Sequence, residues 1–134
     1  MIKPQFDHEK LAVYQRALDF VEIADLIIEG QAKRLSVVDQ LDRASTSIPL
    51  NIAEGNGKFT PPDRCRFHDI ARGSALECAA ALDVLVRKKR LDVKDAERGK
   101  AVLVEIVSML VGLIRSQSQD RAYETPATYG AVGD

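Results

Sequence analysis

The sequence contains no tryptophan, only 5% aromatic residues and two cysteines among its 134 residues. A β-sandwich builds its core mainly from aromatic and β-branched side chains, so this composition of aliphatic residues and alanine favours helices packed against helices. A chain of this length fits one domain and can bury roughly two-thirds of its unfolded surface. We therefore predict an all-α protein with a single hydrophobic core.

A large excess of either charge is also absent, because the formal net charge is -1 at pH 7. A general nucleic-acid binder carries a strongly basic surface, so any contact with nucleic acid must be local. The most apolar stretch, residues 101–114, contains Glu105 and Ser108 and is shorter than the roughly 20 residues that cross a bilayer. The first ten residues lack the apolar segment of a signal peptide. Cys65 and Cys78, roughly 20 Å apart on one predicted helix, are interpreted as reduced thiols. These features predict a cytoplasmic protein without membrane contact.

Four segments have the apolar period of amphipathic helices. The first covers about residues 8–29 and ends at Gly30; the second has Ser36 as N-cap and closes at Gly55 and Gly57. The third starts at Thr60 before two prolines, and the fourth follows Asp92 and is expected to fray after Arg115. The short connections predict an antiparallel up-and-down four-helix bundle over residues 1–116. Residues 117–134 lack periodicity and are predicted to form a disordered tail.

The predicted core seam of the third segment follows a spacing of three and four residues. It consists of Phe67, Ile70, Ala71, Ser74, Cys78, Ala81, Leu82 and Leu85.

Pro49 lies inside the second predicted helix, where it removes an amide donor and frees the carbonyl of Ser45. We expect the neighbouring hydroxyls of Ser45, Thr46 and Ser47 to bond the freed backbone groups at a gentle kink.

A line of polar residues with spacings of four, four and three also follows the second helix. The spacing alone allows two interpretations. The line is either a solvated face whose ion pair contributes about 0.3–0.5 kcal/mol, or a partly buried network at an interface. The residues are Arg43, Ser47, Asn51 and Glu54, with Ser74 and Glu77 on the third helix.

The run QLDRASTSIPLNIAEG, residues 40–55, closely resembles the signature of the four-helix proteins encoded in 23S ribosomal RNA intervening sequences. Residues 11–17 and 67–77 carry further matches, and together the resemblance covers about residues 6–113. It implies a four-helix bundle that assembles into a ring, typically a homopentamer, with no established enzymatic activity. With the resemblance included, we expect an interhelical or intersubunit polar network of Gln40, Arg43, Ser47, Asn51, Glu54, Ser74 and Glu77.

A related branch, the accessory variability determinants of diversity-generating retroelements, binds nucleic acid and a reverse transcriptase. The near-zero net charge departs from the strongly basic surface expected of that branch. One local charge cluster nevertheless follows from the predicted topology, which places two loops at the same end of the bundle. This basic pole consists of Lys33, Arg34, Arg87, Lys88, Lys89 and Arg90. It is interpreted either as helix-dipole and solubility charge or as a phosphate-binding surface that a ring would repeat.

No catalytic, cofactor or metal site is predicted. Neither His8 nor His68 has the glutamate three residues earlier that di-metal bundles use. Cys65 and His68 are interpreted as packing and surface residues, since no third group that would orient a base is identifiable. Two hypotheses remain. The leading one is a non-enzymatic assembly or scaffold protein, and the alternative is an adaptor that contacts nucleic acid, or a nucleic-acid-processing protein, through the basic pole.

Overall fold

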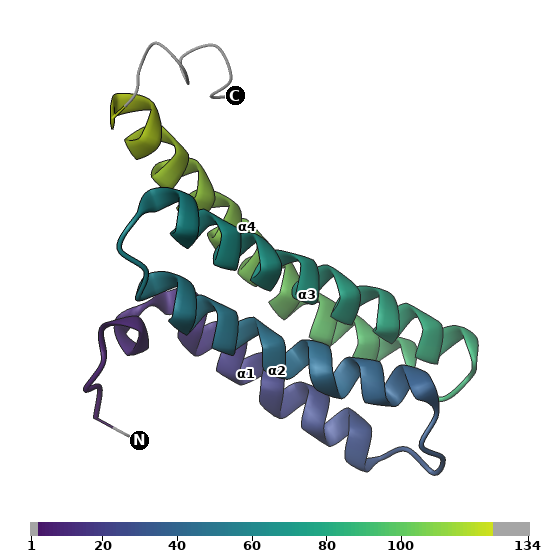
Figure 1. Cartoon of the computed structure of the whole chain (residues 1–134). Helices are drawn as coiled ribbons and strands as arrows, with labels where there is room; N and C mark the ends of the chain where they lie inside the picture. The colour runs from purple at the N-terminus through teal and green to yellow at the C-terminus, as the bar shows by residue number, and fades with distance from the viewer. Residues whose placement is uncertain (1–2, 125–134) are drawn as a thin grey trace.

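The structure, a computed structural model, describes residues 3–124, and side chains as far as residue 118. A short 3-10 helix, η1 (Asp7–Lys10), precedes four α-helices: α1 (Ala12–Glu29), α2 (Ser36–Asn56), α3 (Pro61–Arg87) and α4 (Val93–Glu124). Each helix runs opposite to the one before it (Figure 1). Within the described residues there is no strand, which confirms the predicted all-α bundle. None of these helices is long and apolar enough to cross a membrane.

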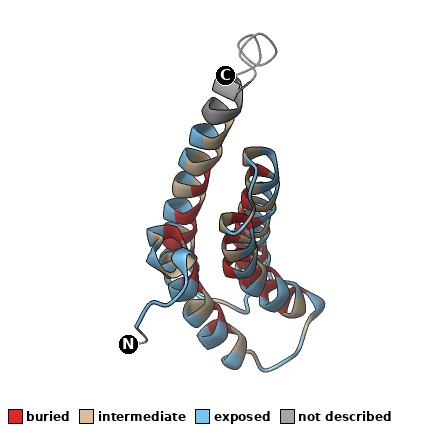
Figure 2. Ribbon diagram, turned by 60° about the vertical axis from the view of Figure 1, so that its left-hand side comes forward, coloured by how far each residue is buried: buried red, intermediate tan, exposed pale blue. Residues whose placement is uncertain are grey.

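The four helices form a closed square. Each packs on its two neighbours, α1 on α2 and α4, and α3 on α2 and α4, while in the described part of the chain no Cα atoms of helices on the diagonal come within 8 Å of each other. The contacts of α3 are the most extensive and those of α1 the least. The parts of the ribbon coloured as buried face the inside of the bundle, and those coloured as exposed face outward (Figure 2). The largest core residues are Phe20, Leu41, Ile48, Ile52, Leu82, Leu85, Ile106 and Leu110.

Side chains at the surface also join α1 to α4. Arg16 donates two hydrogen bonds to the carboxylate of Glu105, at 2.9 and 3.1 Å, and a third to Asp19 at 3.0 Å. The guanidinium holds the pKa of the Glu105 carboxyl below its usual value. Because its planar fork contacts both carboxylate oxygens, Arg16 sets the register of the two helices as well as adding charge attraction.

The helix ends match the sequence predictions in part. Thr60 is the N-cap of α3, since its hydroxyl accepts a hydrogen bond from the Asp63 amide at 3.4 Å. Ser36 is the first residue of α2 and Leu35 the N-cap, a shift of one position. Gly55 lies buried inside α2 and does not end it; Gly57 is the C-cap.

Two further predictions about the elements need correction. Ile70 was assigned to the core but lies on the outer face of α3, with 43% of its surface exposed. The boundary predicted at residue 116 falls inside α4, which continues to Glu124, and Gln117 still contacts α3. The remainder of the predicted tail, residues 125–134, lies outside the described residues.

Helix α2 passes through Pro49 without interruption. The hydroxyls of Ser45 and Thr46 both donate to the carbonyl of Asp42, each at 3.0 Å. These hydroxyls bond a carbonyl in the preceding turn and not the Ser45 carbonyl that proline frees, so the prediction that they bond the freed backbone groups is wrong. Ser47 instead uses its hydroxyl to contact α3.

Candidate functional site

The α2 and α3 helices meet through a small polar contact at the middle of the predicted network. The hydroxyls of Ser47 and Ser74 are 2.9 Å apart, and the amide of Asn51 donates to both the hydroxyl and the carbonyl of Ser47 at 2.9 Å. Because the Ser47 oxygen already accepts from Asn51, its own proton is available for Ser74. These short side chains let the two helices approach closely.

The other four network residues remain open to solvent. Gln40, Arg43, Glu54 and Glu77 are exposed, and only Glu54 has an ion pair, to Lys58 at 3.8 Å. Since α2 and α3 are antiparallel and Ser47 faces Ser74, Arg43 and Glu77 lie at nearly the same level of the bundle. Side chains of α2 from Asp42 to Glu54 line a hollow of about 500 Å³ there. Within the described residues the seven thus form one joined triad, one glutamate paired with Lys58 and three side chains without a hydrogen bond or ion pair.

The outer face of α3 carries a second seam that sequence reasoning did not separate from the core. Ile70, Gly73, Glu77, Ala80 and Val84 are all exposed and follow the spacing three, four, three, four. A Cβ at Gly73 would meet no atom within 4 Å. Glycine in a helix interior costs roughly 0.5–1 kcal/mol relative to alanine, and no contact with the described residues explains the glycine at position 73. This outer seam could have been found in the sequence, because two interleaved lines of residues with a spacing of three and four follow the segment.

An apolar groove of about 200 Å³ runs beside this seam, between α3 and α4. Leu76 and Val104 line it and are 49% and 65% exposed. Exposed apolar surface next to unpaired charges is typical of a protein contact surface. We define the assembly face as the open residues of α2 and α3 together with this groove.

The basic pole is brought together by the two loops at the opposite end of the bundle from η1. Gln31, after α1, donates to the carbonyl of Arg90, after α3, at 3.0 Å. Arg34 is neutralised by Asp39 at 2.7 Å and Asp42 at 3.5 Å. Within residues 3–118 the other five cations, Lys33, Arg87, Lys88, Lys89 and Arg90, are exposed and form no ion pair. Lys89 has a positive φ of 59°.

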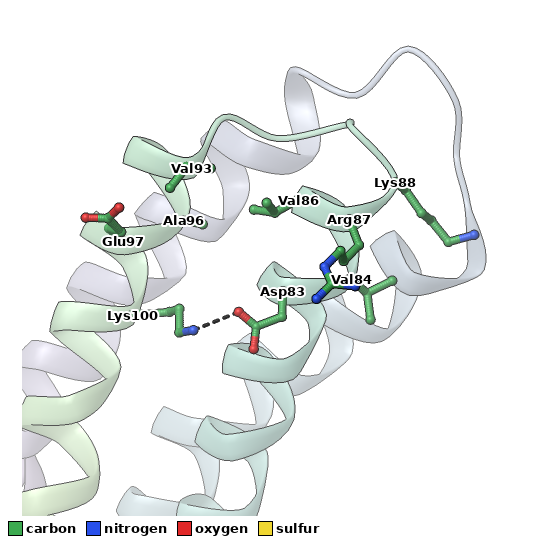
Figure 3. Close-up of a pocket in the computed structure, with 9 residues that line it drawn as sticks. All are labelled: Asp83, Val84, Val86, Arg87, Lys88, Val93, Ala96, Glu97 and Lys100. Atoms are coloured by element: carbon green, nitrogen blue, oxygen red, sulfur yellow. Dashed lines mark hydrogen bonds and ion pairs between the residues drawn. The ribbon is translucent and has the colours of Figure 1, made fainter.

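A hollow of about 520 Å³ lies between the end of α3 and the start of α4, beside the basic pole (Figure 3). Valine and alanine side chains form part of its lining, and Arg87 and Lys88 contribute cations. The ammonium of Lys100 contacts Asp83 at 2.7 Å, and Glu97 adds a second carboxylate. Because charges of both signs line the hollow, its electrostatic potential does not select for a bound anion.

A buried cluster of Cys65, His68 and Gln117 joins α3 to α4. The Nδ1 atom of His68 is 3.1 Å from the amide oxygen of Gln117, and the sulfur of Cys65 is 3.6 Å from the same oxygen. Since that oxygen can only accept, Nδ1 carries the proton. The other ring nitrogen, Nε2, is buried and makes no hydrogen bond of good geometry within the described residues, although the backbone of Ile52 is near enough to the ring to raise its pKa. Gly55 makes room for the ring, because a Cβ there would lie 2.9 Å from its Cδ2.

This cluster is not arranged for catalysis. Cys65 and His68 share Gln117 as a partner and form no hydrogen bond with each other. Cys78 is also buried, and burial raises the pKa of its thiol to about 12, so its reactive thiolate is scarce at neutral pH. Within residues 3–118 no three histidine, cysteine, aspartate or glutamate side chains gather where they could hold a metal ion.

Stability is expected to fall as the pH falls below 6.5, because burial lowers the pKa of His68. The unfolded chain then binds a proton that the folded chain resists, so the slope approaches but does not exceed about 1.4 kcal/mol per pH unit. Urea unfolding at pH 7.5, 6.5 and 5.5 measures it. His68→Gln keeps a donor for Gln117 but cannot titrate, and should flatten the curve. Equal pH dependence in the two proteins would show that His68 is not the titrating group.

A sequence model of the family described as 23S rRNA-intervening sequence protein matches residues 9–112. Among solved structures, the chain is similar to a protein of unknown function from the S23 ribosomal protein family of Bacteroides thetaiotaomicron. The two are 25% identical, with a TM-score of 0.72 over 77% of this chain and 98% of the other. No curated protein matches the sequence.

Proposed function

Because the chain belongs to the 23S rRNA-intervening sequence protein family, we propose that it is a non-enzymatic scaffold protein that assembles with copies of itself. The observation that carries this proposal is the outer seam of α3, where apolar residues, an unexplained glycine and an unpaired glutamate share one exposed face. Helical seams of this spacing pack against other helices. A second copy of the chain is the partner we propose.

A ring needs two different surfaces that complement each other on each subunit, because a head-to-tail contact repeats around the axis. The assembly face offers such a pair. Arg43 and the 62% exposed Leu50 lie on α2, while Glu77 and Ile70 lie on α3. A guanidinium can hold a carboxylate at two points, so Arg43 of one copy is proposed to bind Glu77 of the next.

Light scattering is expected to give a native mass near five times that of the 14.8 kDa chain. Arg43→Glu and Glu77→Arg should each weaken assembly about tenfold or more, because each places like charges together. The double variant, which restores an opposite pair in reversed order, should recover the native mass. Circular dichroism checks that each variant keeps its helices.

Lys94→Glu provides the matched control, since Lys94 is exposed at the start of α4, away from the assembly face. It reverses the same amount of charge and should leave the mass unchanged. A wild-type monomer at micromolar concentration would remove the assembly proposal. Full-size assemblies of both single variants would instead exclude the Arg43 and Glu77 contact.

A second candidate function is that of a nucleic-acid-associated adaptor, which the five unpaired cations of the basic pole favour. In a ring each subunit would repeat the pole, and the combined surface would bind phosphates multivalently. Such binding should be steeply salt-dependent and should include duplexes, since phosphates are its only target. Neutralising Arg87, Lys88, Lys89 and Arg90 to glutamine should abolish it. Absence of binding even at low salt would contradict this candidate.

A further inference from the structure

Most of the phenylalanines lie at the end of the bundle opposite the basic pole. Three of the four phenylalanines, Phe6, Phe59 and Phe67, lie at this end, and only Phe20 is in the core. Figure 1 shows the loop between α2 and α3 beside η1 at this end. Phe59 is 96% exposed and Phe6 64% exposed. We call this end, from Phe6 to Lys10 and from Asn56 to Phe67, the aromatic pole.

The loop that carries Phe59 is held firmly on both sides. The amide of Lys58 donates to the carbonyl of Gly55 at 3.1 Å, and the guanidinium of Arg64 donates to the carbonyl of Lys58 at 2.7 Å. Thr60 caps α3 directly after Phe59, and Pro61 and Pro62 follow. The backbone therefore holds the Phe59 ring in solvent, where an apolar side chain gains nothing from the fold.

Cations accompany these rings. The ammonium of Lys58 and the guanidinium of Arg66 lie 4.9 and 4.7 Å from the centre of the Phe67 ring. Phe6 stacks on His8 with ring centres 5.9 Å apart. The pole also contains Asp7, Glu9 and Asp63, and Lys58 forms an ion pair with Glu54 at 3.8 Å, so the net positive charge is small and Arg66 is the less compensated cation.

We propose that the aromatic pole binds single-stranded nucleic acid, with a base stacked on Phe59 and phosphates near Lys58 and Arg66. A protein partner would require a contiguous apolar patch, whereas the Phe59 ring pairs with no other aromatic ring of the described residues and is flanked by Lys58 and Thr60. A base needs only one face of a ring together with a nearby cation. Bases paired in a duplex do not expose that face, so single strands are preferred. This inference is independent of both self-assembly and the basic pole.

The absence of tryptophan makes Phe59→Trp a unique fluorescent reporter in the full chain. The probes are labelled oligouridine and oligothymidine of about 12 nucleotides, within the usual site size, and a duplex of equal length. We expect both single strands to quench the tryptophan and the duplex to do so much less. Leu18→Trp, at an exposed apolar position in the middle of α1 and away from both poles, is the control and should not be quenched.

Anisotropy with the same probes gives the affinity. Phe59→Ala is expected to weaken single-strand binding about fivefold or more, and Arg66→Gln to lower its salt dependence. Neutralising the four arginine and lysine residues of positions 87–90 should leave it unchanged. The proposal is overturned if no single strand binds, if Phe59→Ala binds as the wild type does, or if only the variant at positions 87–90 loses binding. Because the Phe59 side chain is almost fully exposed, its substitution should not impair folding. Circular dichroism of each variant checks that the helices are retained.

Discussion

Phe20→Ala is expected to lower the free energy of unfolding by about 3–5 kcal/mol, the range found when a buried phenylalanine is truncated. Phe20 is fully buried in α1 and reaches α4, where its ring lies 3.6 Å from the place of a Cβ at Gly99. Truncation leaves a cavity between α1 and α4 that rigid neighbouring helices can only partly close. Urea unfolding at one fixed protein concentration measures the loss, since assembly would otherwise shift the apparent stability.

Phe20→Leu is the comparison for this position. It keeps most of the apolar volume and is expected to cost less than about 1.5 kcal/mol. A loss below about 1 kcal/mol for Phe20→Ala would show that the core closes around the missing ring, contrary to the partial closure expected here.

Gly55→Ala is expected to destabilise the protein by about 1–3 kcal/mol, although alanine is the better helix former. Its Cβ would lie 2.9 Å from the Cβ of Phe67, an atom that cannot move unless α3 moves. It would also press on the His68 ring at 2.9 Å and disturb its bond to Gln117. Thermal and urea unfolding both report the change.

Gly112→Ala is the matched control, because a Cβ at that helical position meets nothing within 4 Å. It should leave stability unchanged or raise it by up to about 1 kcal/mol. If Gly55→Ala behaves like Gly112→Ala, the close approach of α2 and α3 at His68 is not a constraint on the fold.

Local patterns predicted the helices well because their causes are local. The cap at Thr60 and the apolar period of each segment act within a few residues, so their signals can be read directly from the sequence. Gly55 was misread for the opposite reason. A Gly-x-Gly pair resembles a helix end, but the first glycine is required by His68 and Phe67, which come from another helix. Gln117 is a similar case, since its partners in α3 are distant in sequence.

The candidate site was predictable as a set of residues and less so as an arrangement. The polar stripe of α2 includes both Ser47 and Arg43 and does not distinguish between them. Only the register of α2 against α3 shows that Ser47 is hydrogen-bonded to α3 and that Arg43 is exposed. Ile70 shows the same limit. A spacing of three and four residues identifies a line of residues along a helix, but it does not say whether that line faces the core or the solvent. Helix α3 has one line of each kind.

The left-handed backbone at Lys89 has a consequence for the basic pole. A residue with a side chain in this conformation costs roughly 1 kcal/mol relative to glycine, which is the usual occupant of such a turn. The chain therefore stores backbone strain at the point where it adds a third consecutive cation. Lys89→Gly would relax the turn but would also remove a positive charge. At this position the residue that best stabilises the fold is therefore not the one that keeps the basic pole most positive.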